Sequence, residues 1–448
     1  MNVRERNDLL ALGNFEAPGL FPRLEALALQ PRQFRVDFGL PALPDEPGLI
    51  VIRGPRQYGK STWLESSLRE STVRAGPGTA YHLNGDEVTG ADGLAREIRE
   101  LVPLFARGRG PRRLFIDEIT AVAGWERALK VLLDEGVLRD VLVVTTGSKA
   151  TDLRRGAERL PGRKGRLART AWLFTPVAFA EFRRVAGPDL GDSCLPAYLL
   201  AGGSPVACAE VAGTGRLPEY VAETTRDWVH GEIAASGRSR ASLQAVMSCL
   251  ERFGGTPVGQ AKLAREAGLA NNTVAAGYLE LLADLMVAGF SPAWDESRRV
   301  AVARRPAKFP FVNLLAAMCW DPVRPRSVAE VEAAPPEHHG RWLEWLVAQE
   351  LWRRAAIRGE QMPEVLPHWR SGEREIDFVR PEAGSPRGPA DVFVEVKRGR
   401  ARPFEYAWFP EVFPRGSLRV VGRDAFQAGP VRGIPIEDFL EDPESDLP

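Results

Sequence analysis

A glycine-lysine loop near the start of the chain has the spacing of a phosphate-binding loop. Residues 54–61 read Gly-Pro-Arg-Gln-Tyr-Gly-Lys-Ser and fit the pattern GxxxxGK[ST]. The backbone N–H groups of such a loop point at phosphate oxygens, and the following helix directs its positive end at the same anion. We expect Lys60 to contact the β- and γ-phosphates of ATP and Ser61 to bind Mg²⁺. The residues expected to bind the nucleotide are Gly54, Pro55, Arg56, Gln57, Tyr58, Gly59, Lys60, Ser61 and Thr62.

A chance match in a glycine-rich chain is the alternative interpretation of this loop. Only seven of the 59 basic residues are lysines, so a lysine at the required position speaks against chance. The context agrees, because an apolar strand-like run precedes the loop and a helix-like run follows it.

Two adjacent carboxylates follow the loop in the same part of the chain. Asp117 and Glu118 end the apolar run 114–116. Asp117 has the chemistry to hold the water shell of Mg²⁺, and Glu118 to act as the base that polarises the attacking water. The alternative is a strand end that merely becomes polar at the surface. A glutamate directly after the aspartate favours an ATP hydrolase over a nucleotide-binding switch.

Two hydroxyl residues, Thr146 and Ser148, close the next apolar run, VLVVTTGS. Parallel strands end at one edge of a sheet, so these side chains are expected near the γ-phosphate. There they would position the attacking water. A turn capped by hydroxyl groups is the alternative for each of them.

A basic segment follows and is the candidate source of an arginine that acts across a subunit interface. It carries Lys149, Arg154, Arg155, Arg159, Arg163, Lys164, Arg166 and Arg169. An arginine supplied by a neighbouring subunit neutralises the charge that develops on the γ-phosphoryl group. We favour Arg166 for this role, with Arg163 second. A solvated basic loop is the alternative.

A second group of charged residues lies near the C-terminus. Asp377 stands in EREIDFV, and Glu395 and Lys397 stand in DVFVEVK. Alternate residues share a face of a strand, so a hairpin would bring Asp377 beside Glu395 and Lys397. Two carboxylates can bind Mg²⁺ and a lysine can orient a hydroxide. This arrangement resembles that of PD-(D/E)xK nucleases, and Glu344 on the preceding helix matches their helix acid. Ordinary cross-strand ion pairs on a half-exposed hairpin are the alternative.

The elements that must position the first group alternate between strand and helix. Apolar strand patterns and helical patterns follow one another from Leu49 to Ser148. This alternation predicts a parallel sheet covered by helices on both faces.

Composition excludes several other classes of protein. The chain has 448 residues, which suggests roughly three domains. Its formal net charge is zero, so any surface for nucleic acid must be local. The four cysteines form no CxxC pair, and no zinc spacing is present. No secretory signal and no run of about 18 apolar residues is found, so we expect a cytoplasmic protein with no membrane partner.

Beyond the sheet, the pattern suggests further domains. Residues 256–303 have the helix, turn, helix and hairpin pattern of a winged helix. Asn271 is expected either to read bases or to cap its helix, and Arg298, Arg299, Arg304 and Arg305 are expected to contact phosphates. The predicted divisions are a lead-in (1–48), an ATPase core (49–185), a helical region (186–250), a winged helix (251–315), a linker (316–336), a nuclease-like domain (337–425) and a loose acidic tail (426–448).

The chain resembles the AAA-superfamily ATPases of bacteria and archaea that join an ATPase core to a winged helix and a C-terminal restriction-endonuclease-like domain of the PD-(D/E)xK type. The segments that carry the resemblance are GPRQYGKST, LFIDEITAVAGWERALKVLLDEG, TTGSKATDL, Gly165-Arg166 before PVAFAEF, AGGSPVA, GRWLEWLVAQEL, EIDFV and VEVK. The family usually has one Gly-Arg pair before its Pro-x-x-Phe-x-Glu-Phe segment, whereas this chain has two.

The resemblance implies a P-loop AAA-type parallel sheet, with ATP and Mg²⁺ as ligands. It also implies a ring-shaped homo-oligomer, a hexamer among the candidates, that works on DNA. The expected activity is Mg²⁺-dependent ATP hydrolysis coupled to DNA binding, translocation or remodelling. Two alternatives stay open: an ATP-gated metal-dependent DNA nuclease, and an ATP-driven switch that acts on a protein partner.

Overall fold

The computed structural model describes residues 1–108, 110–147, 153–154, 156, 158, 160, 162, 165–360, 366–381 and 391–445. These residues form two compact units. The N-terminal unit comprises residues 1–33 and 37–175, and the C-terminal unit comprises residues 34–36 and 176–448. The division after Thr175 falls before residue 185, where we expected the ATPase core to end. Two predicted site residues, Ser148 and Arg163, lie outside the described residues.

A parallel sheet forms the centre of the N-terminal unit, as the alternation of strand and helix predicted. Its five strands run in the order β2-β3-β4-β1-β5, and every neighbouring pair is parallel. The strands are β1 (Gly48–Arg53), β2 (Ala80–Asn84), β3 (Arg112–Asp117), β4 (Val141–Gly147) and β5 (Ala171–Leu173). β4 is buried along its whole length, which explains its continuous rather than alternating apolar pattern.

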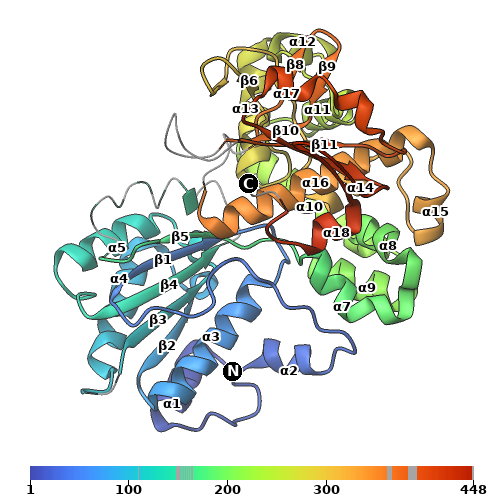
Figure 1. The fold of residues 1–448 in the computed structure, drawn as a ribbon. Coiled ribbons are helices and arrows are strands. Elements are labelled where there is room, and N and C mark those ends of the chain that lie inside the picture. The colour runs from blue at the N-terminus through green and yellow to red at the C-terminus, as the bar shows by residue number, and fades with distance from the viewer. Residues whose placement is uncertain are drawn as a thin grey trace. The chain divides into compact units, whose positions relative to one another are not determined.

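Helices cover both faces of this sheet (Figure 1). α3 (Lys60–Ala75) packs on one face, and α4 (Gly90–Leu101) and α5 (Trp125–Asp134) contact each other on the other face. Short 3₁₀ turns lie at Gly85–Glu87, Val102–Leu104 and Ile119–Ala121. The apolar core on the side of α4 and α5 includes Leu94, Ile98, Leu114, Ile116, Leu129 and Val143.

The first 33 residues belong to the N-terminal unit rather than to a separate lead-in. They form α1 (Val3–Leu12) and α2 (Pro22–Ala28). The buried Asn7 side chain donates to the backbone oxygen of His82 at 2.8 Å and accepts from its N–H at 2.9 Å. This paired bond fixes α1 against the edge strand β2.

The C-terminal unit begins with helices and continues with a helix-turn-helix and a hairpin. Its first helices are α7 (Phe179–Leu190), α8 (Cys194–Ala201), α9 (Pro205–Thr214), α10 (Glu219–Ala235) and α11 (Arg240–Phe253), with a 3₁₀ turn at Gly191–Ser193 between α7 and α8. α12 (Gln260–Glu266) and α13 (Asn272–Asp284) precede the antiparallel pair β6 (Ala293–Asp295) and β7 (Val300–Val302). The Asn271 side chain accepts from the N–H of Val274 at 3.0 Å, which makes it the cap of α13.

Three further helices follow, and they alter the expected linker. α14 (Leu314–Trp320) is buried at every residue, so the expected linker does not begin at residue 316. α15 is Val328–Glu332 and α16 is Pro336–Arg358. Trp342 and Trp345 of α16 are fully buried and Trp352 nearly so. Within the described part of the chain, no helix combines the length and the apolarity needed to cross a bilayer.

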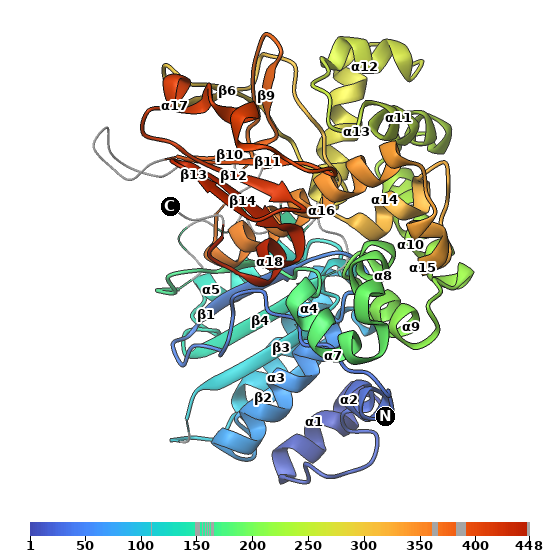
Figure 2. The same cartoon turned by 45° about the vertical axis from the view of Figure 1, so that its right-hand side comes forward.

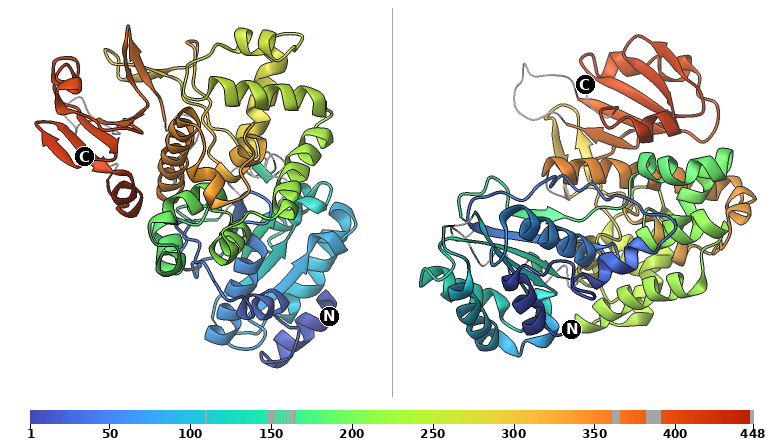
Figure 3. Two further views of the ribbon diagram at one scale, coloured as in Figure 1. Left: turned by 90° about the vertical axis from the view of Figure 1, so that its right-hand side faces the viewer. Right: turned by 90° about the horizontal axis from the view of Figure 1, so that it is seen from below.

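A mixed five-stranded sheet completes the C-terminal unit, in the order β10-β11-β12-β14-β13. Its strands are β10 (Phe378–Arg380), β11 (Val392–Val396), β12 (Ser417–Gly422), β13 (Phe426–Ala428) and β14 (Val431–Pro435), and the hairpin β8 (Trp369–Ser371) with β9 (Arg374–Ile376) precedes them. A turn at Pro403–Tyr406, α17 (Phe409–Val412) and α18 (Ile436–Glu441) accompany the sheet. Figures 2 and 3 show α16 and α18 near one face and α17 near the other. Residues 426–441 therefore form two strands of the sheet, β13 and β14, and the helix α18, not the acidic tail that we expected.

Gly165 has a backbone position that only glycine can occupy. It forms an antiparallel bridge with Gly48 at the start of β1. Its φ is +79°, and a Cβ would lie 2.6 Å from the oxygen of Pro47 and 2.8 Å from the Cα of Gly48. This contact holds the segment that carries Arg166 against the beginning of β1.

We expect Gly165→Ala to destabilise the N-terminal unit more than Gly136→Ala. Gly136 also has a positive φ, of +76°, but nothing lies within 4 Å of its Cβ position. The left-handed conformation alone costs about 1 kcal/mol, and the clash should add roughly 1–3 kcal/mol. Urea denaturation of the two variants measures the difference. Equal midpoints would contradict the close approach of Gly165 to β1.

Candidate active site

The residues predicted to bind the nucleotide lie in the loop between β1 and α3 and in the first turn of α3. Gly54 lies against β5, since a Cβ on it would be 2.8 Å from the backbone oxygen of Phe174. Gly59 takes a φ of 96° and caps the start of α3. Between these glycines, Arg56 and Gln57 are exposed, whereas Tyr58 is buried. The helix thus begins at Lys60, with its N-terminal N–H groups facing the loop.

Lys60 is buried inside this loop. Its Nζ donates to the backbone oxygens of Gly54 at 2.9 Å and Pro55 at 2.7 Å. Burial lowers the pKa of Lys60 to about 8, against the opposing effect of the carboxylates of Glu118 and Asp117. The ammonium group therefore lies where a phosphate would stabilise its charged form.

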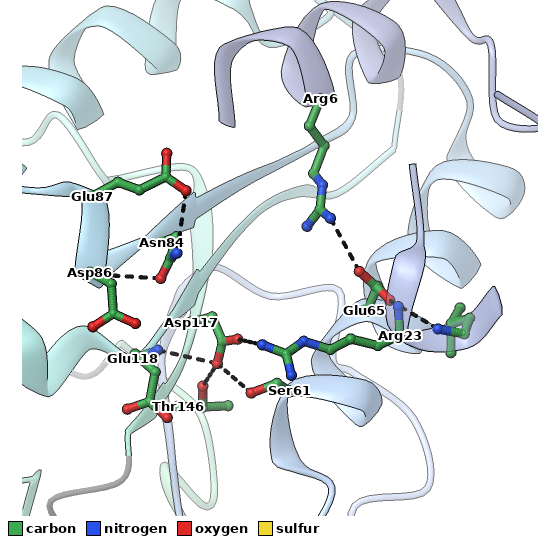
Figure 4. Close-up of polar contacts among 11 residues, drawn as sticks. Arg6, Arg23, Ser61, Glu65, Asn84, Asp86, Glu87, Asp117, Glu118 and Thr146 are labelled. Carbon is green, nitrogen blue, oxygen red and sulfur yellow. Dashed lines mark hydrogen bonds and ion pairs between the residues drawn. The ribbon is translucent and has the colours of Figure 1, made fainter. Parts of the chain in front are cut away.

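Asp117 is the centre of the polar contacts around the loop (Figure 4). Its Oδ1 accepts from the hydroxyl of Ser61 at 3.0 Å, the hydroxyl of Thr146 at 2.5 Å and the N–H of Glu118 at 3.1 Å. Its Oδ2 lies 3.5 Å from the guanidinium of Arg23. The loop serine and the strand-end carboxylate, 56 residues apart in sequence, are therefore in direct contact.

The order of the strands explains why a threonine takes part. β4 lies between β1 and β3, and its Thr146 is paired in register with Ile52 while Thr145 is paired with Ile116. All three strands run in the same direction, so their carboxyl ends meet at one edge. Thr146 is fully buried there. Ser148, which was predicted to lie near the γ-phosphate together with Thr146, falls outside the described residues.

Glu118 lies at a sharp turn directly after β3. Its φ is 47° and its ψ is 43°, a left-handed conformation that is strained for a residue with a side chain. The turn ends the strand while the N–H of Glu118 still bonds to Asp117. The side chain is half-buried, and its carboxylate is close enough to Lys60 to oppose the lowering of the pKa of that lysine.

Arg23 was not among the site residues predicted from the sequence. The N–H groups of Arg23 and Leu24 donate to the buried carboxylate of Glu65 on α3, at 2.7 and 3.1 Å. Burial raises the pKa of Glu65, against the effect of these bonds and of Arg6. This docking of α2 places the Arg23 guanidinium beside Asp117. No motif in the lead-in predicted it, because the contact depends on how α2 packs.

Arg166 lies at the other end of β1 from the phosphate loop. The preceding Gly165 is paired with Gly48, the first residue of β1. At about 3.3 Å per residue, the strand separates this point from Gly54 by ~20 Å. Arg166 is exposed. It therefore does not take part in the site of its own N-terminal unit.

The residues present fit a magnesium ion at the edge of the loop. Mg²⁺ prefers hard oxygen ligands and keeps several waters. The Ser61 hydroxyl and the Asp117 carboxylate converge at 3.0 Å, and Thr146 fixes the orientation of the carboxylate. Ser61 and Asp117 are the residues that would hold the ion.

Comparison with known protein families identifies the domain that contains the phosphate loop. Residues 46–183 match the family model described as an AAA domain. They form an AAA-type P-loop ATPase domain. The protein is accordingly an ATP hydrolase, and the contacts around Asp117 lie within the matched residues. No curated protein matches the chain.

Several solved structures are similar to parts of the chain. The Walker-type ATPase PABY2304 of Pyrococcus abyssi is 14% identical, with a TM-score of 0.41 over 67% of this chain and 94% of its own. The Orc1 protein of Aeropyrum pernix in complex with DNA is 15% identical, with a TM-score of 0.32 over 71% and 94%. The AMPPCP-bound DnaA of Aquifex aeolicus is 14% identical, with a TM-score of 0.27 over 61% and 88%. These TM-scores are too low to bear on the function of this chain.

The charged residues predicted near the C-terminus also lie together, within the C-terminal unit. The N–H of Asp377 donates to Glu395 Oε2 at 3.3 Å, and Lys397 Nζ lies 2.7 Å from Glu395 Oε1. Glu344 of α16 joins them through Lys308, which lies 3.4 Å from Glu344 and 2.8 Å from Asp377. Lys308 was not among the predicted site residues, although the scarcity of lysine could have singled it out.

Burial dominates the protonation of this cluster. Burial, with Asp377, raises the pKa of Glu344 to about 7 against the opposing effect of Lys308. Burial, with Asp377, raises the pKa of Glu395 to about 8. Burial disfavours the charged form of Lys308, yet Asp377, Glu344 and Glu375 together keep its pKa above the usual value. Lys308 is thus a stable cation.

We expect the affinity of the protein for Mg-ATP to fall as the pH rises through 8. The pKa of Lys60 is lowered to about 8, so the lysine is charged below that pH and neutral above it. Loss of the ammonium removes a phosphate partner and should weaken binding by up to ~10-fold per pH unit above 8. Calorimetric titrations at pH 7, 8 and 9 measure this.

Lys60→Arg is the matched control for this pH dependence, because arginine stays charged over the whole range. Its affinity should be lower but independent of pH. A flat profile in the unmodified protein, or the same decline in Lys60→Arg, would contradict the role of Lys60.

Proposed function

We propose that the protein is an oligomeric, Mg²⁺-dependent ATPase that couples ATP hydrolysis to DNA binding, translocation or remodelling. The observation that carries the ATPase part is the contact of Ser61, Asp117 and Thr146 at the edge of the phosphate loop. This contact joins the residue types needed for the phosphates, the ion and the water within one buried edge.

Each residue of the site has a distinct task in this scheme. Lys60 and the loop N–H groups hold the β- and γ-phosphates, and Ser61 and Asp117 hold the ion. When bound, Mg²⁺ neutralises charge on the phosphate oxygens. Glu118 accepts the proton of the attacking water, and Thr146 keeps Asp117 oriented. The Arg23 guanidinium adds positive charge at Asp117 Oδ2.

Arg166 supports assembly into a homo-oligomer, the ring expected from the sequence. It is exposed and lies at the opposite end of β1 from its own loop. A stabilising arginine from this position can act only on the γ-phosphate of a neighbouring subunit. The active site is then complete only when two copies meet.

Mixing two inactive variants tests both Glu118 and Arg166. Glu118→Gln should bind ATP but lower kcat by ~10²-fold or more, because the base is lost. Arg166→Ala should bind ATP and lower kcat by ~10³-fold, because the neighbour loses its arginine. A 1:1 mixture pairs an intact Glu118 with an intact Arg166 at about one quarter of the interfaces, so turnover should return.

Lys60→Ala mixed with Glu118→Gln is the matched control, since no hybrid interface then combines an intact loop with an intact base. Steady-state ATPase rates of all mixtures decide the outcome. Full activity of Arg166→Ala alone would place the arginine elsewhere. Unchanged turnover in Glu118→Gln would reject Glu118 as the base.

The DNA part of the proposal is supported by the helix-turn-helix and hairpin of the C-terminal unit. Asn272 and Thr273 at the start of α13 are exposed, as are Arg298 and Arg304 on and after the hairpin. Exposed arginines on such a hairpin suit phosphate contacts. Arg299 was also predicted to contact phosphates, but its guanidinium donates two hydrogen bonds to Asp391, at 2.6 and 3.0 Å. The buried face of α13 packs within the unit.

We expect DNA to stimulate the ATPase and the pair Arg298→Ala, Arg304→Ala to weaken that effect. Removing two phosphate contacts should lower the salt dependence of DNA affinity by about two units of slope. ATPase rates with single-stranded, forked and duplex DNA, read with binding at several salt concentrations, measure it. Arg96→Ala with Arg127→Ala removes equal charge from exposed sites of the other unit and should have no effect. Absence of any DNA effect at low salt would favour a switch that acts on a protein partner.

A further inference from the structure

Among the described residues of the C-terminal unit, Lys308 is the most deeply buried cation, and it comes from a segment in which no site residue was predicted. It follows the hairpin β6–β7, and its backbone exchanges two hydrogen bonds of 2.9 Å with Ser291. Its side chain is only 1% exposed. The backbone is thus tied to the region of the hairpin, while the side chain leaves that region and enters the acidic cluster.

The ammonium group of Lys308 has three carboxylate partners. Its Nζ lies 2.7 Å from Glu375, 2.8 Å from Asp377 and 3.4 Å from Glu344. A lysine ammonium has three N–H donors; two of them donate to Glu344 and Asp377, and Glu375 is close enough for an ion pair. The partners come from α16 and from the end of the β8–β9 hairpin. A single cation therefore contacts three carboxylates that come from two separate elements.

The remaining carboxylate oxygens of the cluster also face protein groups. Asp377 Oδ2 accepts the N–H of Val396 at 2.8 Å. Glu395 uses one oxygen for Lys397 and the other for the N–H of Asp377. Glu344 Oε2 faces Gly255, where an added Cβ would lie 2.4 Å away. Within the described ranges, no group of three or more His, Cys, Asp or Glu side chains is arranged to hold a metal ion.

We propose that Lys308 permanently supplies the positive charge that a divalent cation would supply in a nuclease of this design, so that the C-terminal unit neither binds Mg²⁺ at Glu344, Asp377 and Glu395 nor cleaves DNA. The cluster instead fastens the C-terminal sheet to the segment that follows the β6–β7 hairpin.

Geometry and charge both support this exclusion. Mg²⁺ needs several oxygens at about 2.0–2.1 Å in octahedral directions. An ion bound to Asp377 Oδ1 would stand next to an ammonium that already bonds to the same oxygen at 2.8 Å. Two cations at that separation repel strongly in a buried site. The residues present therefore do not fit a divalent cation while Lys308 is in place.

Lys308 joins separate elements of the C-terminal unit because its carboxylate partners lie on elements other than its own. Removal of one member of a buried charge cluster leaves the others without compensation, which is strongly destabilising. Loss of Lys308 would leave Asp377, with 8% exposure, and Glu344 without their cation. A divalent cation could then take its place. The proposal is independent of the DNA-coupled function and bears only on what the acidic cluster does.

The test measures Mn²⁺ binding by electron paramagnetic resonance and melting temperature in the full-length, nucleotide-free protein. The unmodified protein and Asp377→Asn should bind the same amount of Mn²⁺. Lys308→Met should melt roughly 5 °C or more lower, gain one Mn²⁺ site and recover stability when Mn²⁺ is added. The gained site should disappear in Lys308→Met with Asp377→Asn. Any Mn²⁺ held by the phosphate loop is common to all these variants and cancels.

Lys130→Met is the matched control, because it removes an exposed lysine on α5 and should leave both readouts unchanged. Lys308→Arg keeps the charge and should not gain a Mn²⁺ site. Mn²⁺ binding or plasmid cleavage by the unmodified protein that Asp377→Asn abolishes would overturn the proposal. So would a Lys308→Met protein that melts like Lys130→Met. If Lys308→Met does not fold, the comparison of the unmodified protein with Asp377→Asn still decides.

Discussion

The N-terminal unit depends on the carboxylate of Asp117. Three segments meet at its two oxygens: the start of α3 through Ser61, the end of β4 through Thr146 and the lead-in through Arg23. Asp117 is only 6% exposed. A buried carboxylate must have its acceptor capacity satisfied, and here the groups that satisfy it are those that would surround a nucleotide. The same contacts therefore stabilise the fold and arrange the chemistry.

In the C-terminal unit, too, buried carboxylates are satisfied by hydrogen bonds and a positive charge, but the cation is a different one. Around Asp117 the positive charge comes from the half-exposed Arg23 and from Lys60, whose pKa is lowered by burial. Around Asp377 the positive charge comes from Lys308, which is fully buried and has three carboxylate partners. We propose that a site that binds a magnesium nucleotide needs a positive side chain that the ligand can move aside. The C-terminal cluster, which we propose only joins elements of the fold, does not need a movable cation.

The chain thus joins an AAA-type ATPase domain to a unit with its own helices and sheet. Arg166 is exposed and follows Gly165, which is paired with the start of β1, at the opposite end of that strand from the phosphate loop. We propose that it acts on a neighbouring copy. The exposed arginines of the hairpin suit a polyanion. Neither Arg166 nor the arginines of the hairpin lie at the edge of the sheet that carries Asp117. In our proposal, ATP hydrolysis and the binding of DNA therefore belong to different parts of the chain.

Local pattern sufficed for the parallel sheet and for the loop, because alternating apolar runs and the spacing from Gly54 to Ser61 depend on neighbouring residues only. The proximity of Asp117 and Thr146 to the loop followed from the rule that parallel strands end at one edge. The contacts of Arg23 and Lys308 could not be read in this way, since each joins segments about 70 to 90 residues apart through the packing of whole elements. For the same reason the residues from 436 to 441 were expected to be loose: their acidic composition is visible locally, but the packing of α18 against β14 and α7 is not. Residue spacing determined which groups could do chemistry, and tertiary packing decided which cation each carboxylate received.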